Sequence, residues 1–280
     1  MQYCYEIKLD AAQAQSALCP VIDNLKQPLE VYNTFVSKGC AHSAVFKSSH
    51  LTSIVAACNK FKIDGTAVEN QWFPKESFHI FLSHSHADEE LAVMLATALK
   101  EQANLDVFVD SMVWNFRDEL ISKLWDSSGD GLLSGDVKIQ RYRNLIGHVD
   151  CMLNKSLLQM IDSCECLLFL NTPNSVTASD VSRRTYSPWI YSELEASRFV
   201  RRHQDPRRKP STGGRAIAMD SALPIEYKLP RLQTLNMEMV KQWLVRIKTL
   251  GRQPFAALDA LYKLAVADDY SKAEIAGGKI

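Results

Sequence analysis

The feature that most constrains the fold of this chain is a series of short apolar runs, each with the length of a β-strand. Three are strong, FHIFLS (78–83), LDVFVD (105–110) and CECLLFLNT (164–172), and two are weaker, RAIAMD (215–220) and RLQTLN (231–236). The third run is almost continuously hydrophobic, which is typical of a strand covered on both faces. Segments with helical periodicity separate the runs, so the sequence predicts an α/β fold with a parallel sheet and helices on both faces.

The best-defined helix follows the first run, and its start has a capping-box spacing between Ser85 and Asp88. Two more helices are predicted over 237–250 and 254–267. The apolar stripe of the first helix recurs at helical spacing and consists of Leu91, Met94, Leu95, Ala98 and Leu99. Ligands of parallel sheets bind beyond the carboxyl ends of the strands, which here carry the polar sequences SHSHAD, DSMVW, NTPNS and MDSAL.

The composition is that of an ordinary globular protein. Hydrophobic residues make up 46% of the 280 residues, charged residues 23%, and the formal net charge is zero. This neutrality argues against broad electrostatic binding to nucleic acid. No run approaches the roughly 18 apolar residues of a membrane span, and the first 20 residues lack the pattern of a signal peptide. We therefore expect a cytoplasmic protein without a membrane partner.

Seven cysteines are scattered along the chain without a CxxC pair. Such a set indicates buried thiols in a reducing compartment rather than a disulfide framework or a zinc site. His84 and His86 lie two apart in a loop, where histidines are more often plain polar residues than ligands. DSSGDGLLSGDV (126–137) begins with calcium-loop spacing but has Val137 where a bidentate glutamate is required. We expect no metal.

Four stretches together resemble a bacterial Toll/interleukin-1 receptor (TIR) domain over about residues 78–250: FHIFLSHSHADEELA, VFVDSMVW, LLFLNTPNS and SPWIYSELEAS. The most specific element is the spacing from Trp189 to Glu193, on the helix predicted after the third strand. The resemblance implies a flavodoxin-like, doubly wound sheet of five parallel strands. It also implies that Glu193 is the catalytic residue for cleaving NAD+ at the nicotinamide–ribose bond, with NAD+ as substrate and no cofactor.

The same resemblance places a substrate pocket beside the loops after the first two strands. The residues that it puts at the border of the substrate are Ser83, His84, Ser85, Asp110, Ser111 and Trp114. Trp189, one turn before Glu193, would form a wall of the pocket or stack on a base. The residues alone also allow a Ser-His-Asp hydrolase of Ser83, His84 and Asp110, but no GxSxG elbow accompanies them.

A single glutamate suits the chemistry of NAD+ cleavage. Nicotinamide leaves as a neutral amine from a cationic precursor, so no general acid is needed, and a carboxylate stabilises the oxocarbenium-like transition state. Ser187 and Pro188 have the pattern of an N-cap and first helical residue, which places Glu193 about a turn and a half inside the helix. Glu195 points to another face, and we expect it at the surface.

We expect the chain to divide into a mixed or helical N-terminal extension of unknown role (1–75), a TIR-like domain (76–250) and a C-terminal helix and tail (251–280). WFPKES (72–77) marks the first joint, because its proline breaks regular structure. Compared with a compact TIR domain, the region 111–162 contains a long insertion. RFVRRHQDPRRKPSTGGR (198–215) is strongly basic, and we interpret it as a solvated helix end and loop.

Two classes of function follow from these patterns. The first is an NAD+ nucleosidase of bacterial antiphage defence, which yields nicotinamide plus ADP-ribose or a cyclic ADP-ribose-type signal. The resemblance implies that such an enzyme acts as a homo-oligomer through TIR–TIR contacts, with a sensor or effector protein as a further partner. The second is a non-catalytic TIR adaptor that acts by self-association. A deoxyribosyl-type hydrolase of nucleosides or nucleotides on a similar fold is a third interpretation.

Overall fold

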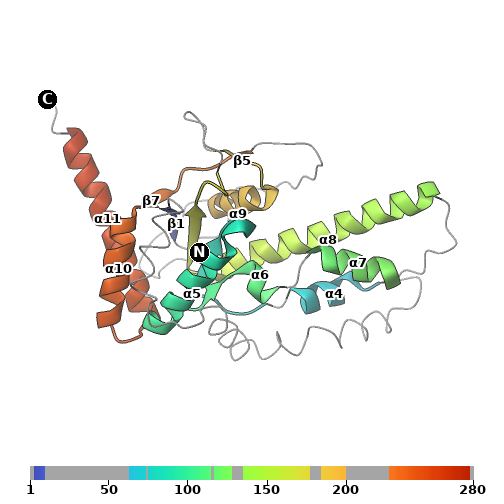
Figure 1. The fold of residues 1–280 in the computed structure, drawn as a ribbon, viewed down its shortest axis with the longest axis horizontal. Helices are drawn as coiled ribbons and strands as arrows, with labels where there is room; N and C mark the ends of the chain where they lie inside the picture. The colour runs from blue at the N-terminus through green and yellow to red at the C-terminus, as the bar shows by residue number, and fades with distance from the viewer. Residues whose placement is uncertain are drawn as a thin grey trace. The chain divides into compact units, whose positions relative to one another are not determined.

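A computed structural model of the chain describes residues 3–9, 63–73, 75–114, 117–127, 135–176, 184–199 and 227–277 (Figure 1). These residues form two compact units. The first unit contains the described residues up to 9, those from 77 to 109, and those from 161 onward. The second contains residues 63–73 and 75–76, and the described residues from 110 to 160.

The first unit is built on a five-stranded sheet in which every pairing is parallel. Its spatial order is β3-β2-β4-β1-β7. The strands are β1 (Tyr3–Lys8), β2 (Ile80–Ser83), β3 (Val107–Phe108), β4 (Cys166–Asn171) and β7 (Gln233–Leu235). This confirms the predicted α/β class with a parallel sheet. Four of the five strands lie inside apolar runs that the sequence identified, and the predicted strand 215–220 lies outside the described residues.

The fifth strand comes from a segment that the sequence assigned to the N-terminal extension. Tyr3–Lys8 forms β1 and lies inside the sheet, between β4 and β7. Residues 3–8 therefore belong to the sheet and not to an extension. Their apolar pattern is interrupted by Glu6 and Lys8, which hid the strand. Counted along the chain, the strand order is 3-2-4-1-5, so β1 holds the place that the fourth strand has in the flavodoxin order 2-1-3-4-5.

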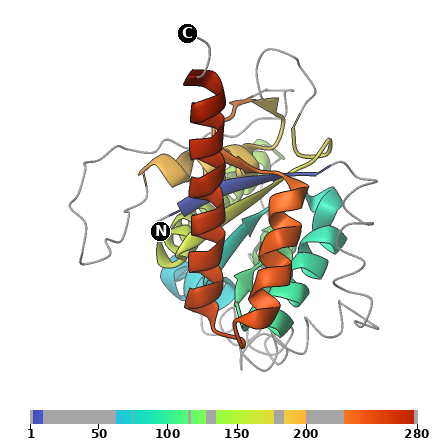
Figure 2. The ribbon, with the colours of Figure 1, turned by 90° about the vertical axis from the view of Figure 1, so that its left-hand side faces the viewer.

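Helices of the first unit cover the sheet as the alternating pattern predicts. They comprise the 3₁₀ turn η1 (His86–Asp88) and the helices α5 (Glu89–Ala103), α9 (Pro188–Phe199), α10 (Met237–Thr249) and α11 (Pro254–Gly277). α10 packs against both α5 and α11, which Figure 2 shows beside it, whereas α9 contacts β2. α9 also contacts a short antiparallel pair formed by β5 (Arg184–Thr185) and β6 (Tyr227–Lys228).

The burial of α5 differs in phase from the predicted stripe. Leu95, Ala98 and Leu99 are buried as expected, whereas Leu91 and Met94 are only half-buried. Ala92, Val93, Ala96 and Thr97 are buried as well. The helix is thus covered over more of its circumference than a simple amphipathic helix, in line with its contacts to both β3 and α10.

A partly buried charge cluster lies where α5 returns to β3. Lys100 Nζ lies 2.6 Å from Asp106 Oδ1, and His79 Nδ1 lies 3.4 Å from Asp106 Oδ2. Burial by itself raises the pKa of the Asp106 carboxyl, but the hydrogen bonds from His79 and Lys100 outweigh it and lower the pKa below its usual value.

The lowered pKa of Asp106 gives a pH dependence of stability with a definite sign. Because the folded-state pKa is depressed, the stabilisation is present above the unfolded value of about 3.9 and is lost as pH falls through the folded value. We expect Asp106→Asn to reduce the free energy of unfolding by up to about 1 kcal/mol at pH 7, and progressively less below pH 4. Urea unfolding of both proteins from pH 3 to 7 measures this, and a pH-independent difference would contradict it.

The cysteines that the structure describes are free, and two of them lie in the core. Burial raises the pKa of the Cys164 thiol to about 12 and that of Cys166 well above its usual value, whereas Cys151 is exposed. The burial of Cys164 and Cys166 was predicted from the sequence, whereas the exposure of Cys151 was not.

This difference predicts selective alkylation of the native protein. Iodoacetamide at pH 8 should label Cys151 while Cys164 and Cys166 stay unmodified, because only an exposed thiolate is a good nucleophile. Trypsin separates the two cases, since Cys151 lies in the peptide 144–155 and the buried pair in 156–183. Unfolding in urea should make all three reactive. Equal labelling of both peptides in the native protein would contradict the burial.

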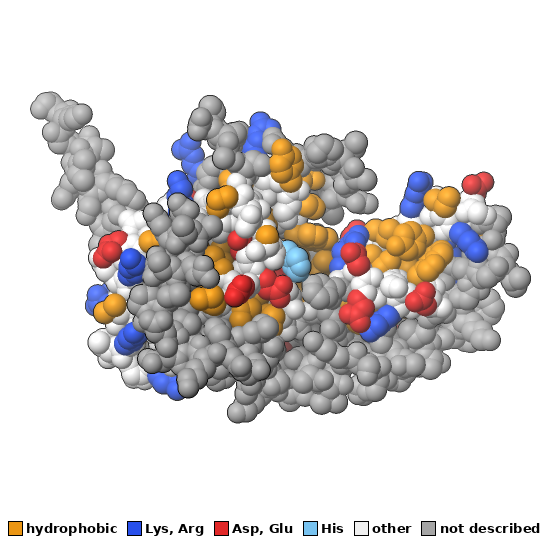
Figure 3. All heavy atoms as spheres, viewed as in Figure 1, with side chains coloured by type: hydrophobic (Ala, Val, Ile, Leu, Met, Phe, Trp, Pro, Cys, Tyr) orange, Lys and Arg blue, Asp and Glu red, His pale blue; other side chains and the backbone are white. Residues whose placement is uncertain are grey.

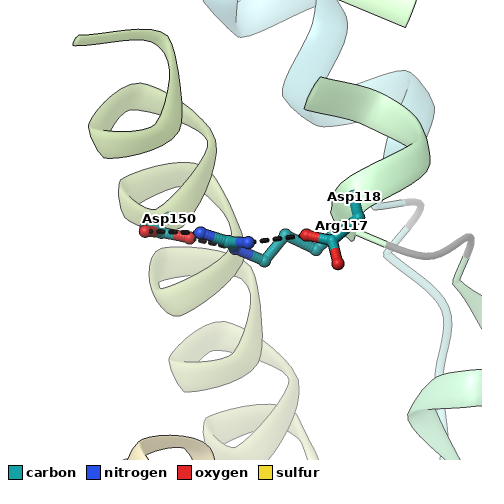
Figure 4. A network of polar contacts seen from close by, with 3 residues as sticks. All are labelled: Arg117, Asp118 and Asp150. Carbon is teal, nitrogen blue, oxygen red and sulfur yellow. Dashed lines mark hydrogen bonds and ion pairs between the residues drawn. The ribbon is translucent and has the colours of Figure 1, made fainter. Parts of the chain in front are cut away.

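The second unit is helical in its described residues. It contains α4 (Gly65–Trp72), α6 (Asp110–Val113), α7 (Arg117–Ser127) and most of α8 (Gly135–Ser163). The predicted insertion 111–162 is therefore occupied largely by α7 and α8. Arg117 joins these two helices: its guanidinium is held by both carboxylate oxygens of Asp150 and lies 2.6 Å from Asp118 Oδ1 (Figure 4). The hydrogen bond with Asp150 is the main cause of a raised Arg117 pKa.

Candidate functional site

A buried hydroxyl–carboxylate pair lies at the carboxyl end of β2. Ser83, the last residue of that strand, donates from Oγ to Oε2 of Glu193 on α9 over 2.6 Å. Ser83 is 1% exposed and Glu193 is 6% exposed. A hydrogen bond of this length to a carboxylate is typical of the stronger, charge-assisted kind. The structure thus brings together two of the residues that the sequence predicted for the site.

The start of α9 explains how Glu193 comes to face the sheet. The Ser187 side chain accepts a hydrogen bond from the Ile190 amide over 3.2 Å, and Pro188 is the first helical residue, which confirms the predicted cap. Ile190 and Leu194 are buried, and Glu193 lies beside them on the covered face. The cap therefore sets where α9 begins, and the burial of Ile190 and Leu194 shows that Glu193 lies on the covered face.

Glu195 is distinct from Glu193, although it is less exposed than the sequence suggested. Its side chain is 18% exposed and accepts hydrogen bonds from Arg198 over 3.1 and 3.2 Å. Trp189, at the first turn of the same helix, is half-buried. Glu195 thus has a local helix-surface partner, and Glu193 has a partner across the fold.

The residues after Ser83 are ordered by local hydrogen bonds. His84 Nδ1 lies 3.1 Å from the Leu82 carbonyl oxygen, so this nitrogen carries the proton and donates. The Ser85 hydroxyl accepts from the Ala87 amide over 3.4 Å and caps η1. His84 and Ser85 are both half-buried beside the carboxyl end of β2, where the sequence predicted them.

Asp88 has a different role from the capping box that the sequence predicted. Its two carboxylate oxygens accept hydrogen bonds from Thr172 Oγ1 over 2.6 Å and from Asn174 Nδ2 over 2.8 Å. Ser175 extends this network, since its hydroxyl donates to the Leu170 carbonyl oxygen over 2.9 Å. Asp88 therefore fastens the segment after β2 to the segment after β4. The polar sequence NTPNS was the available signal for these partners.

Glu6 is a further polar residue that the sequence did not identify. It is 4% exposed and accepts a hydrogen bond from Thr234 Oγ1 over 2.6 Å. Asn171 Nδ2 lies 3.5 Å from its second oxygen. A single glutamate in a strand that was not recognised gave no usable signal.

Three predicted site residues belong to the second unit, and Glu193 to the first. Asp110 and Ser111 begin α6, and both are half-buried. Trp114 is 5% exposed and packs edge to face against Phe73, with ring centroids 5.2 Å apart. Its ring therefore packs inside the second unit, and its place at the border of a substrate stays a prediction.

Within the part of the chain that the structure describes, no group of three or more His, Cys, Asp or Glu side chains is arranged to hold a metal ion. Residues 128–134 of the calcium-like loop lie outside that part. The basic segment beyond residue 199 also lies outside it. Of the described helices, none combines the length and apolarity that a membrane span requires.

Comparison with known proteins identifies no relative of this chain, so its function is inferred from its sequence, its fold and the geometry of its site. No family model matches the chain, and neither a curated protein nor a solved structure is detectably similar to it.

The chemical capacity of this site follows from its environment. A carboxylate that is almost fully buried interacts with nearby charge far more strongly than one in water. Glu193 can therefore stabilise positive charge that develops on a bound molecule, and Ser83 fixes the direction of its carboxylate. His84 and Ser85 directly follow Ser83 in the chain and are further polar residues at this end of β2.

Proposed function

We propose that this protein is an NAD+ nucleosidase of the TIR kind that cleaves the nicotinamide–ribose bond. The observation that carries the proposal is the buried Ser83–Glu193 hydrogen bond of 2.6 Å at the carboxyl end of β2. The segment order supports the family resemblance, since β2, β3 and β4 adopt the arrangement of the first three flavodoxin-type strands, and the glutamate lies on the helix after β4.

In the proposed reaction the C1′–N bond of the nicotinamide riboside breaks, and its electron pair moves to the pyridine nitrogen. Nicotinamide leaves neutral, and the ribose carries the positive charge as an oxocarbenium-like species. Glu193 stabilises that charge, and Ser83 holds the carboxylate in place. Attack of water on C1′ then gives ADP-ribose and one proton. Attack of a nucleophile within the same molecule gives a cyclic product instead.

The biological setting is part of the proposal. We infer a cytoplasmic bacterial antiphage-defence protein that acts as a homo-oligomer through TIR–TIR contacts and that is coupled to a sensor or effector protein. TIR-like enzymes complete their sites across neighbouring protomers, so weak activity is expected from an isolated monomer. NAD+ serves as substrate, and no resident cofactor is proposed.

The test is nicotinamide release by the purified full-length protein, at low and high protein concentration and with a crowding agent. Mass spectrometry of the second product distinguishes ADP-ribose from a cyclic form. A panel with free nucleosides and deoxynucleosides tests the deoxyribosyl-type hydrolase. Release of nicotinamide from NAD+ supports the proposal. Its absence under all conditions, or cleavage of nucleosides alone, overturns the proposal.

One observation favours the second candidate, a TIR adaptor that self-associates. The first half of α8 exposes apolar side chains, with Val137 50%, Ile139 52% and Tyr142 42% exposed. Figure 3 shows orange hydrophobic side chains gathered over the region where Figure 1 places α7 and α8. An adaptor would form oligomers without consuming NAD+. Sedimentation analysis beside the nicotinamide assay separates the two functions.

A further inference from the structure

A second carboxylate lies on the same face of the sheet as Ser83 and at the same level. Ser83 pairs in register with Phe169 of β4, and Phe169 pairs with Glu6 of β1. Glu6 in turn pairs with Thr234 of β7. Side chains in register on neighbouring strands point to the same face of a sheet. This row of four therefore faces the side on which Ser83 meets Glu193.

The two neighbours of Glu6 are oriented by it. Thr234 donates its hydroxyl proton to one carboxylate oxygen, which leaves the lone pairs of its own oxygen for other donors. Asn171 presents its amide nitrogen to the other oxygen at 3.5 Å, so its amide oxygen points elsewhere. Both neighbours are half-buried and lie in the last two residues of their strands, at the carboxyl edge of the sheet. Glu6, Thr234 and Asn171 thus form a cluster that is rich in hydrogen-bond acceptors, namely the oxygen atoms of the three side chains.

Burial of Glu6 needs a reason beyond strand formation. A buried carboxylate loses its hydration, and hydrogen bonds such as those from Thr234 and Asn171 are needed to offset that loss. A valine would complete the same strand without this penalty. An acceptor-rich cluster at a ligand-binding edge suits a ligand that brings several uncharged donors, as the hydroxyls of a sugar do.

We propose that Glu6 is a positioning residue for a second sugar of the substrate. It orients Thr234 and Asn171 so that their oxygens accept hydrogen bonds from the hydroxyls of the adenosine-side ribose. This inference rests on the proposed NAD+ chemistry. Glu6 lies two strands from Ser83, which is about 10 Å at the usual strand spacing, so the sugar concerned is not the one that reacts beside Glu193.

The kinetic test uses Glu6→Gln, which keeps the size of the side chain and removes its charge. KM for NAD+ should rise about tenfold or more while kcat changes less than about threefold. The reason is that the lost hydrogen bonds hold the substrate equally in its ground state and in the transition state. Thr234→Val should act in the same direction. A purely structural Glu6 would lower the melting temperature and leave KM unchanged, and that result in both variants would overturn the inference.

Glu165→Gln is the matched control. Glu165 lies next to β4 at its amino end and accepts a hydrogen bond from the Tyr262 hydroxyl over 3.0 Å. It is thus a hydrogen-bonded carboxylate of the same sheet at the edge where ligands do not bind. KM should be unaffected in this variant. An equal rise of KM in Glu165→Gln and Glu6→Gln would assign the effect to the sheet as a whole and would overturn the inference.

A binding experiment separates this inference from the proposed activity. Calorimetry compares ADP-ribose with an analogue that lacks both hydroxyls of the adenosine-side ribose. The wild type should bind ADP-ribose about tenfold more tightly than the analogue, and Glu6→Gln should bind the two equally. If the wild type discriminates but never cleaves NAD+, the proposed function fails and the role of Glu6 stands. If the wild type does not discriminate, the role of Glu6 fails whatever the activity.

Discussion

Replacing Glu193 by Gln is expected to lower nicotinamide release by about a hundredfold to a thousandfold. The substitution retains the size of the side chain and a hydrogen bond with Ser83, but it removes the negative charge that stabilises the oxocarbenium-like ribose. The loss should appear in kcat and in kcat/KM alike, because the interaction is made in the transition state. A discontinuous or coupled assay of nicotinamide measures it, with Glu193→Ala as a second variant.

The matched control lies two residues away on the same helix. Glu195→Gln removes a carboxylate whose partner is Arg198 on the next turn, and it should leave nicotinamide release within about twofold of the wild type. Circular dichroism and the melting temperature verify that both variants are folded. Equal activity of the wild type and Glu193→Gln would remove Glu193 from the mechanism, even if the protein does release nicotinamide.

Replacing Trp243 by Ala should destabilise the first unit by about 3–5 kcal/mol. Trp243 lies on α10, is completely buried, and donates from Nε1 to the Ala257 carbonyl oxygen on α11 over 2.8 Å. Its removal leaves a cavity between these helices and deletes this hydrogen bond. Urea unfolding followed by circular dichroism at 222 nm reports the change, since this signal does not depend on the missing indole.

Val245→Ala is the corresponding control on the same helix. Val245 is 63% exposed, so its truncation should change the free energy of unfolding by no more than about 0.5 kcal/mol. A loss below about 1 kcal/mol in Trp243→Ala would show that the packing of α10 against α11 contributes little to the stability of the unit.

The parts of this fold that the sequence predicted are those with uninterrupted local signals. Ile80–Ser83 and Cys166–Asn171 lie in apolar runs that only a buried strand accounts for, and Ser187 and Pro188 mark the start of α9 by themselves. Tyr3–Lys8 was missed because Glu6 breaks its apolar pattern. One partner of this glutamate is the hydroxyl of Thr234, more than 200 residues away, which no local pattern encodes.

The same limit applies to the candidate site. Glu193 was predicted through a family resemblance, but its contact with Ser83 joins residues 110 positions apart and emerged only from the folded chain. Asp88 shows the opposite error. A carboxylate beside a helix start satisfies the capping pattern, so a local role was predicted for it, whereas its partners Thr172 and Asn174 follow the end of β4.

The position of β1 also shapes the order in which the chain can fold. β1 lies between β4 and β7, yet β4, the first of these two partners along the chain, begins about 160 residues after it. A growing chain must therefore carry this strand without its sheet partners while those residues are added, and loop closure over that distance makes the pairing slow.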